Sequence, residues 1–456
     1  MRIILWHGYL LTGSGSNVYT ANIARAWRSA GHDVLVMCQD RRSERLDFVD
    51  ATGSFDATNG SFSTRATEVP PAPGSCVVVC PTIGEILPVY VLDDYEGFTA
   101  KLFVDLSERE LIDYTESNVT ALGTAIETFE PDAIVTGHEV MGPAIARHAC
   151  EPRDRDYIVK LHGSALEFAV KRQERYRDEA AYGLNGAAAV AGGSRYMIRA
   201  ASAVVPGWDE RAAVVNPGCD VELFRPASAR AGGPPRVGFV GKLITNKGAH
   251  DLIAAASLLG PRPLHLSIVG DGSFRAELER IAAALVDGDL TRVADVARAD
   301  TSGHLAALEE WARGRDGADV RASYGGVEIE FLGHLEHDPL AGVLPRFDVL
   351  VVPSIVPEAF GMVAAEAAAC GVLPVVPDHS GIAEAGAAIE EAIERPGLLT
   401  YDATRPVEGI AESVEAVLGL DDAERRRLGG AASRLARERW SWDRVAVELL
   451  ELAPRR

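Results

Sequence analysis

The fold is decided by residues 353–377, PSIVPEAFGMVAAEAAACGVLPVVP. An apolar run at 347–352 (FDVLVV) precedes this stretch and predicts a buried strand. The stretch begins with a loop bounded by prolines, continues as a run of small residues typical of a close-packed helix, and ends with Gly371 and a second apolar strand. Strand, loop, helix and strand in this order form one unit of a parallel α/β sheet.

Two carboxylates lie on either side of the predicted helix start. Glu358 precedes it and Glu366 follows, about 12 Å away if the segment were helical throughout at ~1.5 Å per residue. The backbone N–H groups of residues 359–363 would be the unpaired donors of the helix N-terminus, which attract anions. A nucleoside diphosphate sugar has the matching order of groups, namely a ribose diol, a diphosphate and a hydroxylated sugar. We therefore predict a nucleotide-sugar site here.

The composition indicates an acidic α/β protein of two or three domains. The chain has 456 residues, of which 47% are hydrophobic, and a formal charge of −21. An acidic surface disfavours binding to nucleic acid and to anionic membranes. Only five of the 45 basic residues are lysines, a bias typical of GC-rich coding or of salt adaptation. A lysine in this chain is therefore a candidate for a specific role.

The sequence predicts a cytoplasmic protein. Its six cysteines are scattered, and Cys76 and Cys80 have no second cluster that would complete a metal site, so we interpret all six as buried thiols in a reducing compartment. The N-terminal run MRIILWHG is too short for a signal peptide, and no run of about 18 apolar residues predicts a membrane span. Peripheral contact with a membrane stays open.

The N-terminal half begins with a strand at 2–6, a glycine-rich loop and a helix at about 18–30. Gly13, Gly15 and Asn17 lie in this loop, at the carboxyl end of the first strand, where the backbone can approach a ligand. The loop lacks the third glycine of the dinucleotide fingerprint, so it is weak evidence for NAD. A loop that merely turns the chain is the alternative.

Histidines follow two further predicted strands. His162 comes after the strand at 157–161 and is followed by Gly-Ser, and His138 and Glu139 come after the strand at 134–136. Ligands gather at the carboxyl ends of strands in open parallel sheets, so we interpret His162 as a site residue. His138, Glu139 and Asn17 are weaker candidates for contact with an acceptor. Asp93 and Asp94, in a loop before a predicted helix, are interpreted as a helix cap or a contact with the acceptor. A structural role is the alternative for each.

Two of the five lysines lie together in the second half. A strand at 237–241 ends in a loop that carries Lys242 and Lys247 and then enters a helix. Point charges at the carboxyl end of a strand suit the capture of a flexible polyphosphate. The alternative is a pair of solvated lysines at a helix start, where the helix dipole disfavours them. The sequence at 268–273, IVGDGS, repeats the strand-to-glycine-loop design and would line the same site.

We predict four segments. An N-terminal Rossmann-like domain spans 1–220, a linker rich in proline and glycine spans 221–235, a C-terminal Rossmann-like domain spans 236–425, and a helical segment at 426–456 packs back on the N-terminal domain. Two stretches interrupt the alternation of strands and helices: residues 41–74 are polar and predict irregular structure or a short hairpin, and residues 284–326 predict an inserted helical hairpin.

The chain resembles the retaining glycosyltransferases of family four, which have the GT-B architecture. The resemblance covers the chain except for about 41–74 and 284–326, and it rests on the glycine loop, HGS at 162–164, NPGCDVELFRP at 216–226, VGKLITNKG at 240–248 and PEAFGMVAAEAAACG at 357–371. It implies two Rossmann-like α/β domains with parallel sheets that face each other across a cleft, and a C-terminal helix that crosses back to the N-terminal domain. The nucleotide sugar would bind the C-terminal domain and the acceptor the N-terminal one.

The resemblance also implies the roles of single residues. Glu366 would bind the ribose hydroxyls, Glu358 would face the hydroxyls of the transferred sugar, and His162 would contact that sugar near the reaction centre. The diphosphate would meet a larger set, namely Gly15, Lys242, Lys247 and the amides of Phe360, Gly361, Met362 and Val363. Glu358, His162 and Lys247 are the catalytic residues in this assignment. The family usually has arginine where this chain has Lys242, so a bidentate contact becomes a point charge.

The implied reaction is the transfer of a hexose with retention of anomeric configuration, without a metal or another cofactor. The leaving diphosphate would accept the acceptor's proton in a front-face attack, and the enzyme would supply positioning and charge. The sequence indicates neither the base, the sugar, the acceptor nor the oligomeric state. A nucleotide-sugar epimerase or a phosphorylase of the same architecture, and a non-catalytic nucleotide-sugar-binding protein, are the alternatives.

Overall fold

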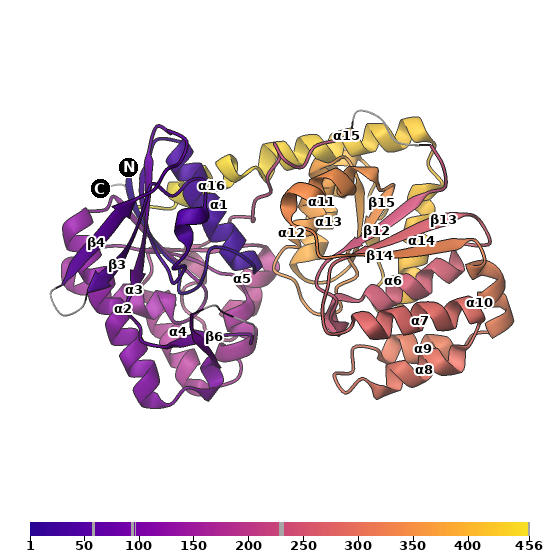
Figure 1. The fold of residues 1–456 in the computed structure, drawn as a ribbon, viewed down its shortest axis with the longest axis horizontal. Coiled ribbons are helices and arrows are strands. Elements are labelled where there is room, and N and C mark those ends of the chain that lie inside the picture. Colours follow the sequence, from indigo (N-terminus) through magenta and orange to yellow (C-terminus); the bar gives the residue numbers. More distant parts are fainter. Residues whose placement is uncertain (57–59, 93–94, 96, 228–231, 455–456) are drawn as a thin grey trace. The chain divides into compact units, whose positions relative to one another are not determined.

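The computed structural model describes residues 1–56, 60–92, 95, 97–227 and 232–454, which form two compact units (Figure 1). Unit 1 comprises Met1–Pro217 and Trp442–Arg456, and unit 2 comprises Gly218–Ser441. The break after Pro217 lies three residues before the predicted end of the first domain. Residues 228–231 of the predicted linker, and the candidates Asp93 and Asp94, lie outside the described residues.

The described strands of unit 1 form one large sheet in the order β11-β10-β9-β8-β1-β2-β5-β3-β4, and β6 pairs with β7 beside it. Neighbours in the large sheet are parallel except β3 and β4, which form an antiparallel hairpin within the stretch predicted as irregular or hairpin. The strands are β1 (Arg2–Trp6), β2 (Asp33–Met37), β3 (Ala51–Asp56), β4 (Ser61–Ala66), β5 (Ser75–Pro81), β6 (Ile86–Val89), β7 (Thr99–Leu102), β8 (Ala133–Gly137), β9 (Ile158–Lys160), β10 (Ala189–Gly192) and β11 (Ala212–Val214).

The central strands of unit 1 are buried on both faces, which explains why they read as continuous apolar runs. Ile3, Ile4 and Leu5 of β1 are all buried, as are their neighbours in β2 and β8. The covering helices are α1 (Gly15–Ser29), α2 (Glu108–Phe129), α3 (Gly142–Cys150), α4 (Glu174–Gly186), α5 (Arg195–Ser202) and α16 (Trp442–Glu451).

Unit 2 contains a second sheet, in the order β14-β13-β12-β15-β16-β17, and all its described pairs are parallel. Its strands are β12 (Arg236–Val240), β13 (Leu264–Val269), β14 (Val327–Gly333), β15 (Val349–Val351), β16 (Leu373–Pro377) and β17 (Thr400–Tyr401). Its helices are α6 (Ala249–Ala255), α7 (Arg275–Asp287), α8 (Leu290–Ala299), α9 (Ala306–Arg313), α10 (Gly317–Tyr324), α11 (His337–Val343), α12 (Met362–Ala369), α13 (Ser380–Ile393), α14 (Pro406–Leu418) and α15 (Asp422–Arg439). Two α/β units with parallel sheets confirm the predicted fold class.

The stretch at 284–326 is not a helical hairpin, because three helices, α8, α9 and α10, follow the end of α7. Side-chain caps define two of their starts. The carboxylate of Asp289 accepts a hydrogen bond from the Arg292 amide, and that of Asp316 accepts from the Ala318 amide. The caps mark the starts of separate helices, which the hydrophobic pattern of the sequence did not distinguish.

The C-terminal segment is divided between the units, which corrects the prediction that all of 426–456 packs on the N-terminal domain. Helix α15 belongs to unit 2, where the Ser433 hydroxyl donates to the Ala369 carbonyl at 2.9 Å. Helix α16 belongs to unit 1 and lies beside α1 (Figure 1), and the indole of Trp27 donates to the Ala446 carbonyl at 3.0 Å. The amphipathic pattern runs through both helices, so it could not show that they have different partners.

Candidate active site

In unit 2, the carboxyl ends of β12 and β13 lead into adjoining glycine loops. The Gly241 amide donates to the Val269 carbonyl at 3.0 Å, and the Leu243 amide donates to the Asp271 carbonyl at 2.9 Å. The backbones approach so closely that a Cβ at Gly270 would lie 1.9 Å from the Gly241 oxygen. Only glycine fits there, and the expected proximity of the two loops is confirmed.

The loop after β12 presents both lysines at this edge of the sheet. Lys242 is exposed, and Lys247 ends the short turn Thr245–Lys247 just before helix α6. The Asn246 carbonyl accepts a hydrogen bond from the Ile355 amide at 3.0 Å, which ties the lysine loop to the loop that carries Glu358.

Lys247 and Glu358 form an ion pair. The lysine Nζ donates to Glu358 Oε1, and the hydroxyl of Ser354 donates to the same oxygen at 2.7 Å. The Glu358 amide in turn donates to Ser380 Oγ at 3.0 Å. Burial raises the pKa of Glu358, but the charge of Lys247 and the two hydrogen bonds outweigh burial and hold this pKa below its ordinary value. Glu358 is therefore ionised at neutral pH and shares a partly exposed site with a cation.

Helix α12 begins at Met362, with Gly361 as its N-cap residue at a φ of +87°. The amides of Met362 and Val363 are in the first helical turn and have no carbonyl four residues earlier within the helix. Phe360 lies before the cap, and its ring packs edge-on against Trp440 with 5.3 Å between the ring centroids. The helix thus starts later than predicted, so the spacing estimated for a continuous helix does not apply to Glu358 and Glu366. The N-terminus nevertheless follows Glu358 closely in the chain.

Glu366 lies inside α12 and is 7% exposed. Burial raises its pKa to about 8. His337 Nε2 lies 3.8 Å from Glu366 Oε1. Glu366 is therefore protonated at neutral pH, and its carboxyl group can both donate and accept a hydrogen bond.

In unit 1, three histidines meet at the carboxyl edge of the sheet. His7, His138 and His162 follow the neighbouring strands β1, β8 and β9. Ring centroids are 5.6 Å apart for His7 and His138, and 4.8 Å apart for His138 and His162. Burial lowers the pKa of His7 to about 4 and lowers the pKa of both other histidines. All three rings are therefore neutral at neutral pH.

His138 is deeply buried and has an unusual backbone conformation. It is 2% exposed, it adopts a left-handed φ of +69°, and neither ring nitrogen has a hydrogen-bond partner in the described part of the chain. Buried polar atoms without partners are rare in native proteins. Strained backbone is likewise concentrated at functional sites.

The glycine loop of unit 1 leads to the same edge. Gly15 is the exposed first residue of α1, and Asn17 lies in the first turn of the same helix. The Asn17 amide oxygen lies 2.9 Å from His7 Nε2, and its nitrogen donates to the Thr12 carbonyl at 2.6 Å. Asn17 is thus connected to the histidine cluster through His7.

Two buried ionisable side chains, Glu139 and Lys160, lie close to the histidines in the sequence. Glu139 accepts a hydrogen bond from the Gly163 amide at 2.8 Å, and burial raises its pKa to about 7. Lys160 donates to the Val215 carbonyl and lies over the Tyr19 ring, and burial lowers its pKa to about 7. Glu139 therefore holds the HGS turn in place, a positioning contact rather than an exposed binding group.

The predicted site residues fall into two groups. Unit 2 brings together Lys247, Glu358 and the α12 N-terminus, and unit 1 brings together Asn17, Glu139 and the histidines. Sequence analysis missed His7, although it follows a strand as His138 and His162 do, and it missed Ser354 and Ser380, which have no spacing signal. Within the described residues, no group of three or more His, Cys, Asp or Glu side chains is placed to hold a metal ion.

Two family models match the chain. A model described as "Glycosyl transferase 4-like domain" matches residues 14–218, and one described as "Glycosyl transferases group 1" matches residues 322–434. Glycogen synthase of Mycobacterium tuberculosis is 31% identical over 241 residues, which cover 51% of this chain and 46% of the relative. D-inositol 3-phosphate glycosyltransferase of Corynebacterium urealyticum is 30% identical over 267 residues, which cover 55% and 53%. The chain spans about half the length of the curated relatives it matches.

Solved structures share the fold over nearly the whole chain. Sucrose-phosphate synthase from Thermosynechococcus elongatus aligns with a TM-score of 0.62 at 17% identity and covers 99% of this chain and 98% of its own. Anabaena HepE in complex with UDP-glucose aligns with a TM-score of 0.61 at 15% identity, with the same coverage. Among the residues that the structure describes, no helix is long and apolar enough to cross a membrane.

Proposed function

Because the chain belongs to the group 1 glycosyltransferases of family four, with the GT-B fold, we propose that it is a retaining enzyme that transfers a hexose from a nucleoside diphosphate sugar to an acceptor. The observation that carries this proposal is the contact between Lys247 and Glu358 beside the N-terminus of α12. A cation and free helix amides suit a diphosphate, and a carboxylate next to them suits sugar hydroxyls. The crystal structures of HepE with UDP and with UDP-glucose support a nucleotide-sugar donor.

In this proposal, unit 2 stabilises the leaving group. As the bond between the anomeric carbon and the diphosphate oxygen breaks, negative charge grows on that oxygen, and the Lys247 ammonium and the amides of Met362 and Val363 offset it. The acceptor oxygen attacks the same face and passes its proton to the departing phosphate, so no side chain is required as a base. The Lys247 contact with Glu358 would then be exchanged for a contact with phosphate, which frees the Glu358 carboxylate for the hydroxyls of the sugar.

The remaining assignments follow from the family. Glu366 would bind the ribose hydroxyls, and its buried, protonated carboxyl group can both donate and accept there. Lys242 and Gly15 would add contacts to the diphosphate, and His162 would contact the transferred sugar. We propose that no metal or other cofactor takes part, because lysine and helix amides can supply the charge that a metal would otherwise provide.

Product analysis tests the proposal. The full chain is incubated with labelled UDP-, GDP-, ADP- and dTDP-hexoses and a panel of sugar and sugar phosphate acceptors, with and without EDTA. We expect a glycosylated product with the donor's anomeric configuration by NMR, and its loss in Glu358→Ala and in Lys247→Ala. Lys171→Ala, which removes an exposed lysine paired with Glu167 in unit 1, is the matched control.

Four outcomes would overturn the proposal. Full transfer activity in both unit 2 variants would contradict the assignment of Lys247 and Glu358 to the active site. Conversion of the donor sugar without an acceptor would indicate an epimerase, and a requirement for inorganic phosphate would indicate a phosphorylase. Donor binding without any turnover would indicate a nucleotide-sugar-binding protein.

A further inference from the structure

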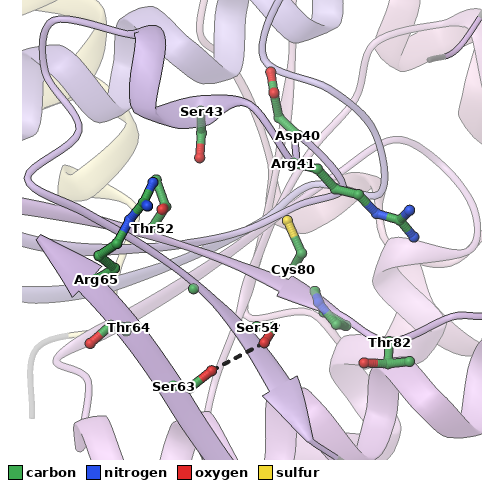
Figure 2. A pocket seen from close by; sticks show the side chains of 12 residues that line it. Asp40, Arg41, Ser43, Thr52, Ser54, Ser63, Thr64, Arg65, Cys80 and Thr82 are labelled. Atoms are coloured by element: carbon green, nitrogen blue, oxygen red, sulfur yellow. Dashed lines mark hydrogen bonds between the residues drawn. The ribbon is translucent and has the colours of Figure 1, made fainter. Parts of the chain in front are cut away.

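A pocket of about 500 Å³ in unit 1 is lined mostly by residues with polar side chains (Figure 2). It is formed by the β3–β4 hairpin, the end of β5 and the turn after β2. Its volume is in the range of pockets that bind small molecules. The lining residues are Asp40, Arg41, Ser43, Thr52, Gly53, Ser54, Ser63, Thr64, Arg65, Cys80, Pro81 and Thr82.

Two arginines are placed on different sides of this pocket. Figure 2 shows Arg65 next to Thr52 on one side and Arg41 on the other. Arg41 stacks on Phe98 at 4.0 Å and donates to the Gly97 carbonyl at 3.3 Å. Within the described parts of the chain, neither Arg41 nor Arg65 forms an ion pair with a carboxylate. In a protein with a net charge of −21, two arginines without carboxylate partners at one pocket suit an anionic ligand.

Hydroxyl groups of the β3–β4 hairpin also line the pocket. Ser54 and Ser63 lie opposite each other on the two strands, with 3.2 Å between their hydroxyl oxygens (Figure 2). Hydroxyls that both donate and accept suit a ligand that carries hydroxyls of its own.

Asp40 is the acidic residue of the pocket lining, and its carboxylate is held by backbone amides. It is 2% exposed, and its carboxylate accepts hydrogen bonds from the Leu11 amide at 3.1 Å and the Arg42 amide at 3.0 Å. Arg45 lies 4.0 Å from the same carboxylate and also donates to the Thr12 hydroxyl at 3.3 Å. These contacts connect the pocket to the residues that directly precede the glycine loop of α1.

We propose that this pocket binds the phosphate group of a hydroxylated acceptor, so that the acceptor of this enzyme is a phosphate ester of a sugar or polyol. The identification as an acceptor rests on the proposed transferase function, whereas binding of a phosphate ester does not. The β3–β4 hairpin supplies Arg65 and both serines of the pocket.

Cys80 gives a direct readout of occupancy without donor or catalysis. It lines the pocket and is partly exposed, whereas the other five of the six cysteines are buried. A hydrogen bond from Cys38 lowers the pKa of the Cys80 thiol, which favours its reaction with a thiol reagent. The rate of alkylation of the native full-length chain by iodoacetamide is measured with glucose 6-phosphate, fructose 6-phosphate, glycerol 3-phosphate, inorganic phosphate or glucose, at constant ionic strength in sodium chloride. Cys80→Ser establishes that the signal comes from this thiol.

We expect at least one phosphate ester to slow alkylation more than threefold, inorganic phosphate to protect only at higher concentration, and glucose to give no protection. Arg65→Gln and Arg41→Gln should each raise the ester concentration for half-protection about tenfold, since each loses a charge-assisted hydrogen bond. Each variant is compared with its own rate without ligand, because Arg41 also affects the Cys80 thiol. Arg109→Gln, which changes an exposed arginine on α2, should match the wild type.

Three results would overturn the proposal. No protection by any ester or by inorganic phosphate would exclude a phosphate site. Protection by inorganic phosphate at equal or lower concentrations than by every ester would indicate a site for the free anion. Unchanged protection in both arginine variants would exclude the assigned ligands. Because no donor is present, these results are independent of whether unit 2 binds a nucleotide sugar.

Discussion

The protonation of Glu366 makes a quantitative prediction about stability. Burial raises its pKa from an ordinary value of 4.5 to about 8. Between these two values the folded protein holds a proton that the unfolded chain has released, so the free energy of unfolding falls as the pH rises, by about 1.4 kcal/mol per pH unit. Over the whole interval this amounts to a loss on the order of 5 kcal/mol.

Glu366→Gln removes this loss, because glutamine has nearly the same shape and no proton to release. We expect the variant and the wild type to have similar stability at pH 5, the variant to become progressively more stable up to about pH 8, and the gap to stay constant above that. Urea unfolding of both proteins from pH 5 to 9 measures the gap, with Glu391→Gln on the exposed face of α13 as the control. A gap that does not change with pH would refute a buried, protonated Glu366.

Two further predictions concern a strained glycine and a buried hydrogen bond. Gly361→Ala should destabilise unit 2 by about 2 kcal/mol in thermal or urea unfolding, because the residue has a φ of +87° and its Cβ would lie 2.8 Å from an isoleucine of α13. Gly342→Ala, with open space around its Cβ, should have little effect, and equal effects of the two substitutions would contradict this reasoning. Trp27→Phe should increase hydrogen exchange in α16 and lower the free energy of unfolding by about 1–3 kcal/mol, because it removes the hydrogen bond to the Ala446 carbonyl. The loss should be larger than for Trp311→Phe, because the Trp311 indole nitrogen has no hydrogen-bond partner within the described residues.

The positions of the strands named in the sequence analysis, and the edge of the sheet that carries the site, could be predicted because they depend on local patterns. Apolar runs gave the strands, and the rule that ligands gather at carboxyl ends of parallel strands pointed to Lys247 and His162 without reference to tertiary contacts. The start of α12 was predicted a few residues too early, because a positive φ at Gly361 is a property of the folded loop. The residues at 359–361, Ala-Phe-Gly, do not mark by their type whether they belong to a helix or to a turn.

Other features depended on contacts between distant segments. The ion pair of Lys247 with Glu358 joins loops 111 residues apart, and the raised pKa of Glu366 comes from burial that no local pattern records. The pocket beside the β3–β4 hairpin was missed for the same reason. Its arginines and serines lie in a polar stretch without periodicity, and only strand pairing brings them together with Cys80.

The role of the Lys247 and Glu358 contact is the central claim, and a double-mutant cycle of donor affinity tests it most directly. Isothermal titration calorimetry is carried out with the UDP-, GDP-, ADP- or dTDP-hexose that most stabilises the protein against heat, on the wild type, Lys247→Met, Glu358→Gln and the double variant. We predict that Lys247→Met weakens binding about tenfold to a hundredfold and that this loss persists in the Glu358→Gln background, because the ammonium binds the diphosphate itself. Lys171→Met should bind as the wild type does. Unchanged affinity in Lys247→Met, or full recovery in the double variant, would contradict the claim, since the lysine would then act only by neutralising Glu358.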